Sequence, residues 1–314
     1  FILSCMLAFS VSTAFGQGYQ FTEVVTVPAT PVKNQAATGT CWCFATTSFM
    51  ESELLRMGKG TYDLSEMFIV RQKYMNQLQD NYLRRGNGNI GQGSLSHTFM
   101  NAYRQVGIVP EEVYTGINYD SERHNHSEMV RYMHAIADVA VKTKQRSPEY
   151  DKLIANLFDT YLGKLPEKFT YKGKEYTPKS FAESLGLNCD DYVSLTSYTH
   201  HPFYTQFAVE VQDNWRNGLS YNLPIDELIA VMDNAVKKGY TFAWGSDVSE
   251  QGFSRNGTAV MPDIIKGAEL SGSDMARWTG MTPADKRREL SSKPSPEMEI
   301  TQEMRQAAFD NWET

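Results

Sequence analysis

The sequence predicts an α+β fold in which helices come first and most strands come later. The first observation is a series of apolar stripes with helical spacing, several of them closed by a glycine such as Gly58, Gly107 or Gly163. The second is that strand patterns are sparse before residue 190 and more frequent after it. The third is a length of 314 residues with 41% hydrophobic residues, which is enough for a sizeable buried core.

Six helices are predicted from apolar stripes, caps and terminators. They cover residues 41–57, 95–106, 147–162, 177–186, 226–238 and 296–312. Ser147 and Pro148 supply a cap and a first-turn proline for the third helix, and Thr177-Pro178 does the same for the fourth. Asp226 in the first turn and Lys237 in the last suit the dipole of the fifth.

Strand predictions are fewer. Residues 169–176 predict a hairpin that turns at Gly173, and residues 192–198 and 204–211 are two further strand candidates. The apolar run at residues 240–244, which follows Gly239, predicts a buried strand.

The first residues are predicted to lie outside the fold. Residues 1–15 form an apolar run that is too short for a membrane span, and Ala14 and Gly16 are small residues at the positions that a signal peptidase reads. We therefore expect residues 1–16 to be part of a signal peptide, with cleavage before Gln17 and export to the periplasm or the medium. Lipidation at Cys5 is disfavoured, because most of the apolar run follows that cysteine.

Charge and histidine placement exclude several classes of partner. The net charge is −7 and no Lys/Arg-rich run is present, so nucleic acid is not an expected partner. No cofactor is predicted. No metal site is predicted either, because the three histidines between residues 124 and 134 lack cysteine or acidic ligands at a recognisable spacing. Those histidines are His124, His126 and His134, and with His200 and His201 they are expected to be solvated or structural.

The chemistry of the chain is concentrated around Cys41. This cysteine follows Gly39-Thr40 at the start of a predicted helix, where the helix dipole and unpaired N–H groups favour a thiolate nucleophile. Gln35 lies six residues upstream and can place an amide donor near the oxyanion of a tetrahedral intermediate. Cys43 is expected to be a core residue. After signal-peptide cleavage only Cys41, Cys43 and Cys189 remain, so at least one thiol would stay unpaired in an exported protein. Exported proteins usually form disulfides, and a catalytic role would explain why one thiol is kept free.

The pattern formed by Gln35, Cys41, Trp42 and Phe44 resembles the nucleophile segment of papain-like cysteine peptidases. Thr38 stands where the papain signature has a second cysteine, as is usual in the bleomycin hydrolase, or aminopeptidase C, branch. Further segments resemble that branch and follow its order. They are residues 89–94, 106–110, 161–170, 221–228 and 242–248.

This resemblance implies a papain-like fold with two lobes. Residues 17–114 would form the helical lobe with the nucleophile, residues 115–220 a family-specific helical insertion, and residues 221–314 the start of an antiparallel β lobe that is incomplete in this chain. The implied function is peptide hydrolysis by an aminopeptidase or oligopeptidase, through a thioester acyl-enzyme on Cys41 with Gln35 in the oxyanion hole. Gly91, Gly93 and Ser94 would bind substrate, since glycine allows an extended peptide to pair with the backbone. Relatives also imply a homohexamer.

One part of the family pattern has no match. The family's catalytic His and Asn come late in the chain, whereas the last histidine here is His201. We therefore expect the sequence to be truncated at both ends, the missing base to lie beyond Thr314, and the fragment alone to be inactive, with His97 as the first alternative base. Two other functions stay open: a catalytically silent peptide-binding relative, and a redox or metal-binding protein that uses Cys41 and Cys43.

Overall fold

The computed structural model describes residues 22–119, 121–144, 146–246, 282 and 299–310. The chain divides into two compact units, one formed by Val25–Gly245 and the other by the two ends of the chain. In the second unit the structure describes helix α11 (Gln302–Asp310). None of the helices in the described ranges is both long and apolar enough to cross a membrane.

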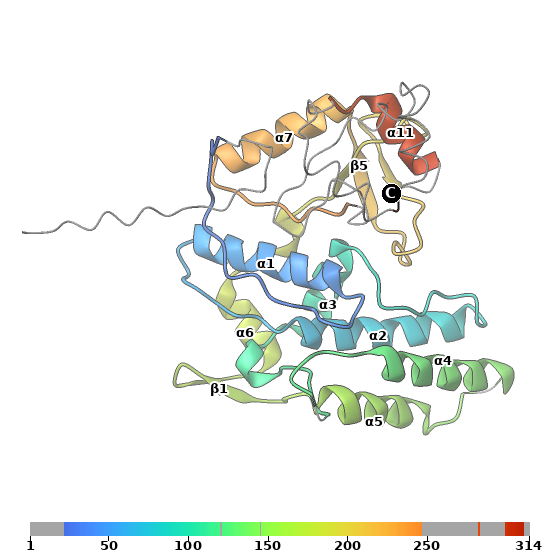
Figure 1. The fold of residues 1–314 in the computed structure, drawn as a ribbon. Helices are drawn as coiled ribbons and strands as arrows, with labels where there is room; N and C mark the ends of the chain where they lie inside the picture. The colour runs from blue at the N-terminus through green and yellow to red at the C-terminus, as the bar shows by residue number, and fades with distance from the viewer. Residues whose placement is uncertain (1–21, 120, 145, 247–281, 283–298, 311–314) are drawn as a thin grey trace, which may run out of the picture. The chain divides into compact units, whose positions relative to one another are not determined.

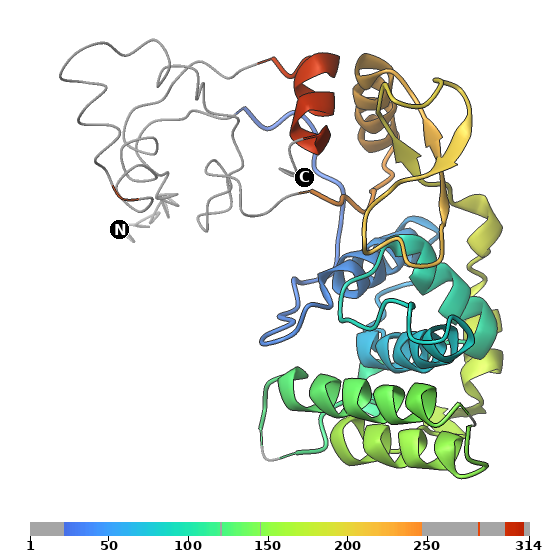
Figure 2. The ribbon, with the colours of Figure 1, turned by 90° about the vertical axis from the view of Figure 1, so that its right-hand side faces the viewer.

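Helices build most of the Val25–Gly245 unit (Figures 1 and 2). They are α1 (Cys41–Arg56), α2 (Glu66–Leu83), α3 (Ser96–Val106), α4 (Ser127–Lys142), α5 (Tyr150–Leu162), α6 (Pro178–Leu185) and α7 (Ile225–Lys237), with short 3-10 turns at Glu111–Val113 and Cys189–Asp191. Helix α2 is central, because it contacts α1, α3, α4 and α5. Figure 1 shows it between α1 and the α4–α5 pair.

The hydrophobic core lies around α2. Tyr74 on α2 is fully buried and stacks on Phe158 of α5, with ring centroids 6.0 Å apart. Met50 and Leu54 of α1 and Phe99 of α3 are fully buried in the same cluster. Each such side chain contributes about 1.5–3 kcal/mol by leaving water, so this core holds α1, α3 and α5 against α2.

A two-stranded hairpin precedes α6. Strand β1 (Phe169–Tyr171) pairs antiparallel with β2 (Lys174–Tyr176), which confirms the predicted hairpin. The turn residues Lys172 and Gly173 have φ of 49° and 79°, the left-handed pair that a tight two-residue hairpin requires.

A three-stranded sheet in the order β3-β5-β4 follows. Strand β3 (Leu195–Thr196) runs parallel to β5 (Leu219–Asn222), while β4 (Gln206–Ala208) is antiparallel to β5 with Phe207 opposite Ser220. The two strand candidates at residues 192–198 and 204–211 therefore contain real but shorter strands. Together with the helices, these sheets confirm the α+β class, and the division into two lobes remains a prediction.

Local helix signals succeeded for α6 but not for the start of α5. Helix α5 begins at Tyr150 with Glu149 as its N-cap and no side-chain cap bond, so the Ser147 cap and the first-turn Pro148 predicted for it are wrong. Thr177 and Ser180 form a reciprocal capping box at the start of α6, and Gly186 ends that helix in the left-handed conformation. The helices predicted from residues 41, 95 and 226 each begin within one residue of that position. Helix α11 begins at Gln302, later than the predicted residue 296, and residues 296–298 lie outside the described ranges.

The strand predicted for residues 240–244 is wrong. Gly239 has a φ of 82°, its N–H donates to Val236 O, and the Tyr240 N–H donates to Ala235 O, which closes the end of α7. The backbone at Tyr240 is therefore used as a helix cap. Trp244 is 62% exposed rather than buried.

Helix α2 was not anticipated from the sequence, although it is the longest described helix. Its buried face carries the polar side chains of Arg71, Lys73, Gln77 and Asn81, which break the apolar stripe. Ser65, which accepts a hydrogen bond from the Phe68 N–H at 3.2 Å, was the available start signal.

Some predictions lie beyond what the structure describes. The signal peptide at residues 1–16 falls outside the described residues. The compact unit Val25–Gly245 runs through the predicted boundaries at 114/115 and 220/221, and these boundaries stay predictions.

Candidate active site

Cys41 is the first residue of α1, and its side chain is exposed. The preceding Thr40 is buried and leaves the helical conformation, with a φ of −103° and a ψ of 20°. Its carbonyl oxygen accepts the N–H groups of Cys43 and Phe44 at 2.9 and 3.3 Å. The thiol thus lies at the start of a 16-residue helix, where the N–H groups of the first two residues precede the first intrahelical bonds.

Cys43 occupies the opposite side of the same helix. Its side chain is fully buried and its Sγ donates to the Glu66 carbonyl oxygen at 3.4 Å. Burial raises the pKa of the Cys43 thiol well above its usual value. Residues two positions apart in an α-helix point in directions that differ by about 200°, so the thiols of Cys41 and Cys43 face different surroundings. Cys43 is a core residue, as predicted.

Gln35 closes the loop that leads into α1. Its Nε2 donates to the Thr38 carbonyl oxygen at 2.7 Å, and the Thr38 hydroxyl donates to the Gln35 carbonyl oxygen at 2.9 Å. These reciprocal bonds hold the half-buried Gln35 side chain within the loop. Its role as an oxyanion donor stays a prediction.

Gln92 joins this loop to the glycine-rich stretch at residues 89–94. Its Oε1 accepts the Gly39 N–H at 2.8 Å, and its carbonyl oxygen accepts the Trp42 indole N–H at 2.9 Å. A Cβ on Gly39 would lie 3.1 Å from the Gln92 Cβ, so the two segments are in close contact. The structure therefore brings the predicted substrate-binding stretch beside the residues that flank Cys41.

Gly91 is held by the side chains of α2. Its N–H donates to Gln77 Oε1 at 3.4 Å, and its carbonyl oxygen accepts the Lys73 ammonium at 2.5 Å. Lys73 is fully buried, and this burial lowers its pKa to about 7. Both polar backbone groups of Gly91 are thus engaged within the protein.

Gly93 and Ser94 are covered by the connection between β4 and β5. A Cβ on Gly93 would lie 2.2 Å from Asp213 Oδ1, so a larger residue here would require the Asp213 side chain to move. The buried Ser94 hydroxyl accepts the Trp215 indole N–H at 3.0 Å and donates to Thr98 Oγ1 at 2.8 Å. Gln92, Asp213 and Trp215 were not predicted as site residues. Only Gln92 carried a signal, because it lies inside the glycine-rich stretch.

His97 lies on α3 with its ring against the Gly218 backbone. A Cβ on Gly218 would lie 2.4 Å from the His97 ring. The Nε2 atom is buried and has no hydrogen-bond partner among the described residues. Burial, and then the nearby Arg216 charge, lower the pKa of His97. His97 is therefore a half-buried imidazole whose Nε2 faces the protein interior, where burial disfavours the charged form.

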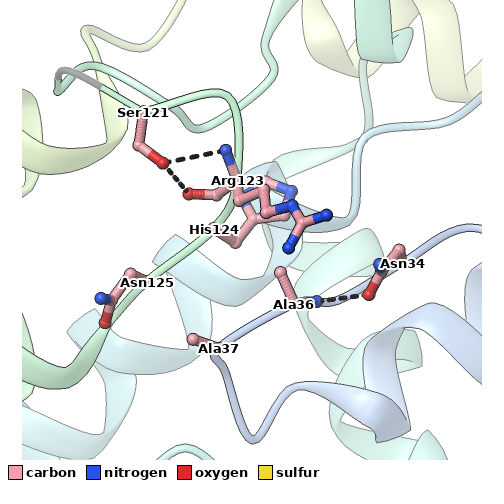
Figure 3. Close-up of a pocket in the computed structure, with 7 residues that line it drawn as sticks. All are labelled: Asn34, Ala36, Ala37, Ser121, Arg123, His124 and Asn125. Atoms are coloured by element: carbon pink, nitrogen blue, oxygen red, sulfur yellow. Dashed lines mark hydrogen bonds between the residues drawn. The ribbon is translucent and has the colours of Figure 1, made fainter.

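A pocket of about 370 Å³ lies beside the loop that precedes α1. Figure 3 shows Asn34 and Ala36 on one side of it, with the Ala36 N–H donating to Asn34 Oδ1 at 2.8 Å. The facing segment contains His124, whose carbonyl oxygen accepts the Ala37 N–H at 3.0 Å. The pocket is lined by Asn34, Ala36, Ala37, Ser121, Arg123, His124 and Asn125.

His124 and His126 are buried rather than solvated, because the segment that carries them packs against the loop before α1. His126 Nδ1 lies 3.0 Å from the Tyr74 hydroxyl, and burial lowers the pKa of His126 to about 3. Both histidines therefore have a structural role in this part of the fold.

Comparison with known proteins supports the resemblance seen in the sequence. The family model described as Peptidase C1-like family matches residues 91–301. Aminopeptidase C from Streptococcus thermophilus is 24% identical over 267 residues, which cover 70% of this chain and 59% of that protein. The chain thus spans 59% of the length of this relative. The family match begins at Gly91, so Gln35 and Cys41 lie before it.

Proposed function

The chain belongs to the Peptidase C1-like family, and from this premise we propose that it is a cysteine peptidase with Cys41 as nucleophile. The observation that carries the proposal is the exposed Cys41 thiol at the first position of α1, beside the loop that Gln92 ties to the glycine-rich stretch. An exposed thiol at a helix start is accessible to a substrate carbonyl and lies in the positive field of the helix.

In the proposed reaction the Cys41 Sγ forms a bond to the carbonyl carbon of a peptide. The C–N bond then breaks, the amine leaves with a proton from a general acid, and a thioester remains on Cys41. Water attacks the thioester, releases the carboxylic acid and returns the thiol. Gln35 would stabilise the oxyanion by turning its amide from the Thr38 carbonyl oxygen toward the intermediate.

The finer assignment is an aminopeptidase or oligopeptidase that acts on peptides. The name of the Streptococcus thermophilus relative supports removal of N-terminal residues. A peptide positioned by Gly91, Gly93 and Ser94 would have to displace the contacts that Lys73, Asp213 and Trp215 make with them. Asp213 above Gly93 would then offer a carboxylate at that end of the stretch. We also propose that the protein assembles into a hexamer, which native mass spectrometry tests. Export from the cell is a further part of the proposal, and cell fractionation tests it.

A catalytically silent peptide-binding protein is the second candidate. It is favoured by one observation: within the described ranges, no histidine is hydrogen-bonded to the Cys41 thiol. A redox pair of Cys41 and Cys43 is disfavoured, because Cys43 is fully buried and faces the Glu66 backbone.

An epoxysuccinyl inhibitor, which alkylates an activated active-site thiol, distinguishes these candidates in the full-length protein. We expect one equivalent of label on Cys41 by mass spectrometry, together with turnover of an aminoacyl fluorogenic substrate. Cys41→Ala should abolish both, while the matched control Cys43→Ala should retain most of both. Peptide binding without label would favour the silent relative, and activity that depends on Cys43 would show that the wrong thiol was assigned.

A further inference from the structure

Two adjacent histidines meet a glutamate at the sheet formed by β3, β5 and β4. His200 Nε2 lies 3.1 Å from Glu210 Oε2, and His201 Nε2 lies 2.6 Å from Glu210 Oε1. One ligand atom of each residue lies within 4.8 Å of the others. His200 and Glu210 are exposed and His201 is half-buried, so the group is open to ions from solvent.

The backbone around these residues is held by a buried amide. Asn222, the last residue of β5, is fully buried, and its Nδ2 donates to the carbonyl oxygens of Tyr198 at 2.8 Å and His201 at 2.9 Å. Its Oδ1 accepts the Tyr198 N–H at 2.9 Å. The loop that carries both histidines is therefore fixed to the sheet by side-chain bonds.

The imidazole rings are fixed as well. The His201 ring stacks on Phe207 of β4, with centroids 4.1 Å apart and planes at 25°. The His200 ring lies against the same Phe207 at 5.6 Å and against His201 at 4.6 Å. Such orientation of the ligands before an ion arrives reduces the entropy lost on binding.

We propose that His200, His201 and Glu210 form a binding site for a divalent transition-metal ion, with Zn²⁺ as the best match. Two imidazole nitrogens and one carboxylate are a ligand set that zinc proteins use, and a fourth position stays open to water. Neighbouring ligands of a tetrahedral zinc ion lie about 3.3–3.5 Å apart, as its bond lengths of about 2.0–2.1 Å require. The observed contacts of 3.1 and 2.6 Å need only a slight opening.

Binding exchanges protons for the ion. Each imidazole that donates its Nε2–H to Glu210 gives up that proton when Nε2 binds the metal, and the ring then carries its proton on Nδ1. Any additional proton is released to solvent, so acidification should weaken binding by direct competition.

The site would brace the region over the glycine-rich stretch. The chain after Glu210 carries Asp213 above Gly93 and Trp215 bonded to Ser94. The Gln212 carbonyl oxygen also accepts the Asn89 side-chain amide at 2.7 Å. An ion that ties Glu210 to the two histidines would therefore hold the start of this covering segment in place.

Titration of the protein with ZnCl₂ by isothermal calorimetry tests the proposal. It is best done in a Cys41→Ser background, because the exposed Cys41 thiol is itself a zinc ligand. We expect one Zn²⁺ per chain. Glu210→Gln and His200→Asn should each weaken binding by at least about 100-fold, since loss of a mere supporting partner already costs 10–100-fold.

His134→Asn is the matched control, because His134 is an exposed histidine on α4 outside this group. It should leave the affinity unchanged. As a second readout, Zn²⁺ should slow amide hydrogen exchange in residues 198–222 of the parent protein and not of Glu210→Gln, while circular dichroism confirms that each variant is folded. Equal affinity in the parent and Glu210→Gln, or no binding in the parent at millimolar ZnCl₂, would overturn the proposal.

Discussion

The Trp42 indole N–H donates a 2.9 Å hydrogen bond to the Gln92 carbonyl oxygen, so the residue after the candidate nucleophile is tied to the glycine-rich stretch. Trp42 is buried, and Gln92 also receives the Gly39 N–H on its side chain. The start of α1 is therefore held from both sides of Cys41 by one residue. This relationship connects the geometry of the thiol to residues fifty positions later in the chain.

Trp42→Phe should slow epoxysuccinyl labelling of Cys41 and lower the free energy of unfolding by about 1–2 kcal/mol. The change removes the indole donor and leaves the Gln92 carbonyl oxygen without that bond. Labelling kinetics and urea denaturation measure the two effects. Trp244→Phe is the control, because that indole is 62% exposed, and similar labelling rates in both variants would contradict the prediction.

Gln35→Ala should lower kcat for peptide hydrolysis by about 10²–10³ with a smaller effect on KM, as expected for one lost oxyanion donor. Gln35 also braces the loop, so a control must separate the two roles. Thr38→Val removes the hydroxyl that donates to the Gln35 carbonyl oxygen and leaves the amide in place. A similar loss of kcat in Thr38→Val would reduce Gln35 to a loop brace.

Lys33→Met should lower the free energy of unfolding by about 3–5 kcal/mol, the usual effect of leaving buried charges unpaired. The Lys33 ammonium lies 3.1 Å from Glu51 and 2.8 Å from Glu66, and both carboxylates are buried. Chemical denaturation gives the difference, with the exposed Lys59→Met as control. A loss below about 1 kcal/mol would show that this network is weakly coupled to folding.

Glu111→Gln should stabilise the protein more at about pH 9 than at about pH 5. Burial, with the nearby Glu66 charge, raises the pKa of Glu111 to about 8, so its folded form retains a proton that the unfolded chain loses near pH 4.5. Stability contributed by this group therefore falls as the pH rises from about 4.5 to 8, and glutamine has no such titration. We expect a difference of at least about 1 kcal/mol between the two pH values.

Urea denaturation of the parent and Glu111→Gln at both pH values measures this effect. The exposed neighbour Glu112→Gln is the control and should show no pH-dependent gain. A gain from Glu111→Gln that is equal at both pH values would mean that the buried carboxyl does not take up a proton on folding.

His97→Gln should leave the rate and pH dependence of Cys41 labelling unchanged. The His97 Nε2 is buried against Gly218, and burial lowers the pKa of His97, so we expect this imidazole not to serve as the base for the exposed Cys41 thiol. Labelling across the pH range in the folded variant is the measurement. A loss of about 100-fold or more would make His97 the general base.

Helix boundaries could be predicted where short-range chemistry decides them. The capping box at Thr177 and the left-handed Gly186 are local features, and the structure has both. Helix α2 could not be predicted in the same way, because the partners of its buried polar residues are distant in sequence. Arg71, for example, donates to the Gly163 carbonyl oxygen and pairs with Asp159 at 2.7 Å. Only tertiary contacts make such a polar face suitable for burial.

The sequence by itself determined the α+β class, the family resemblance and the position of Cys41 at the start of a helix, because these depend on residue patterns over a few turns of chain. Tertiary structure alone decided what surrounds them. It placed Gln92 beside Gly39, Asp213 over Gly93, and Glu210 against His200 and His201. The physical reason is that these contacts join segments whose approach depends on how α2 and the small sheet pack, and packing is a property of the whole core rather than of any local pattern.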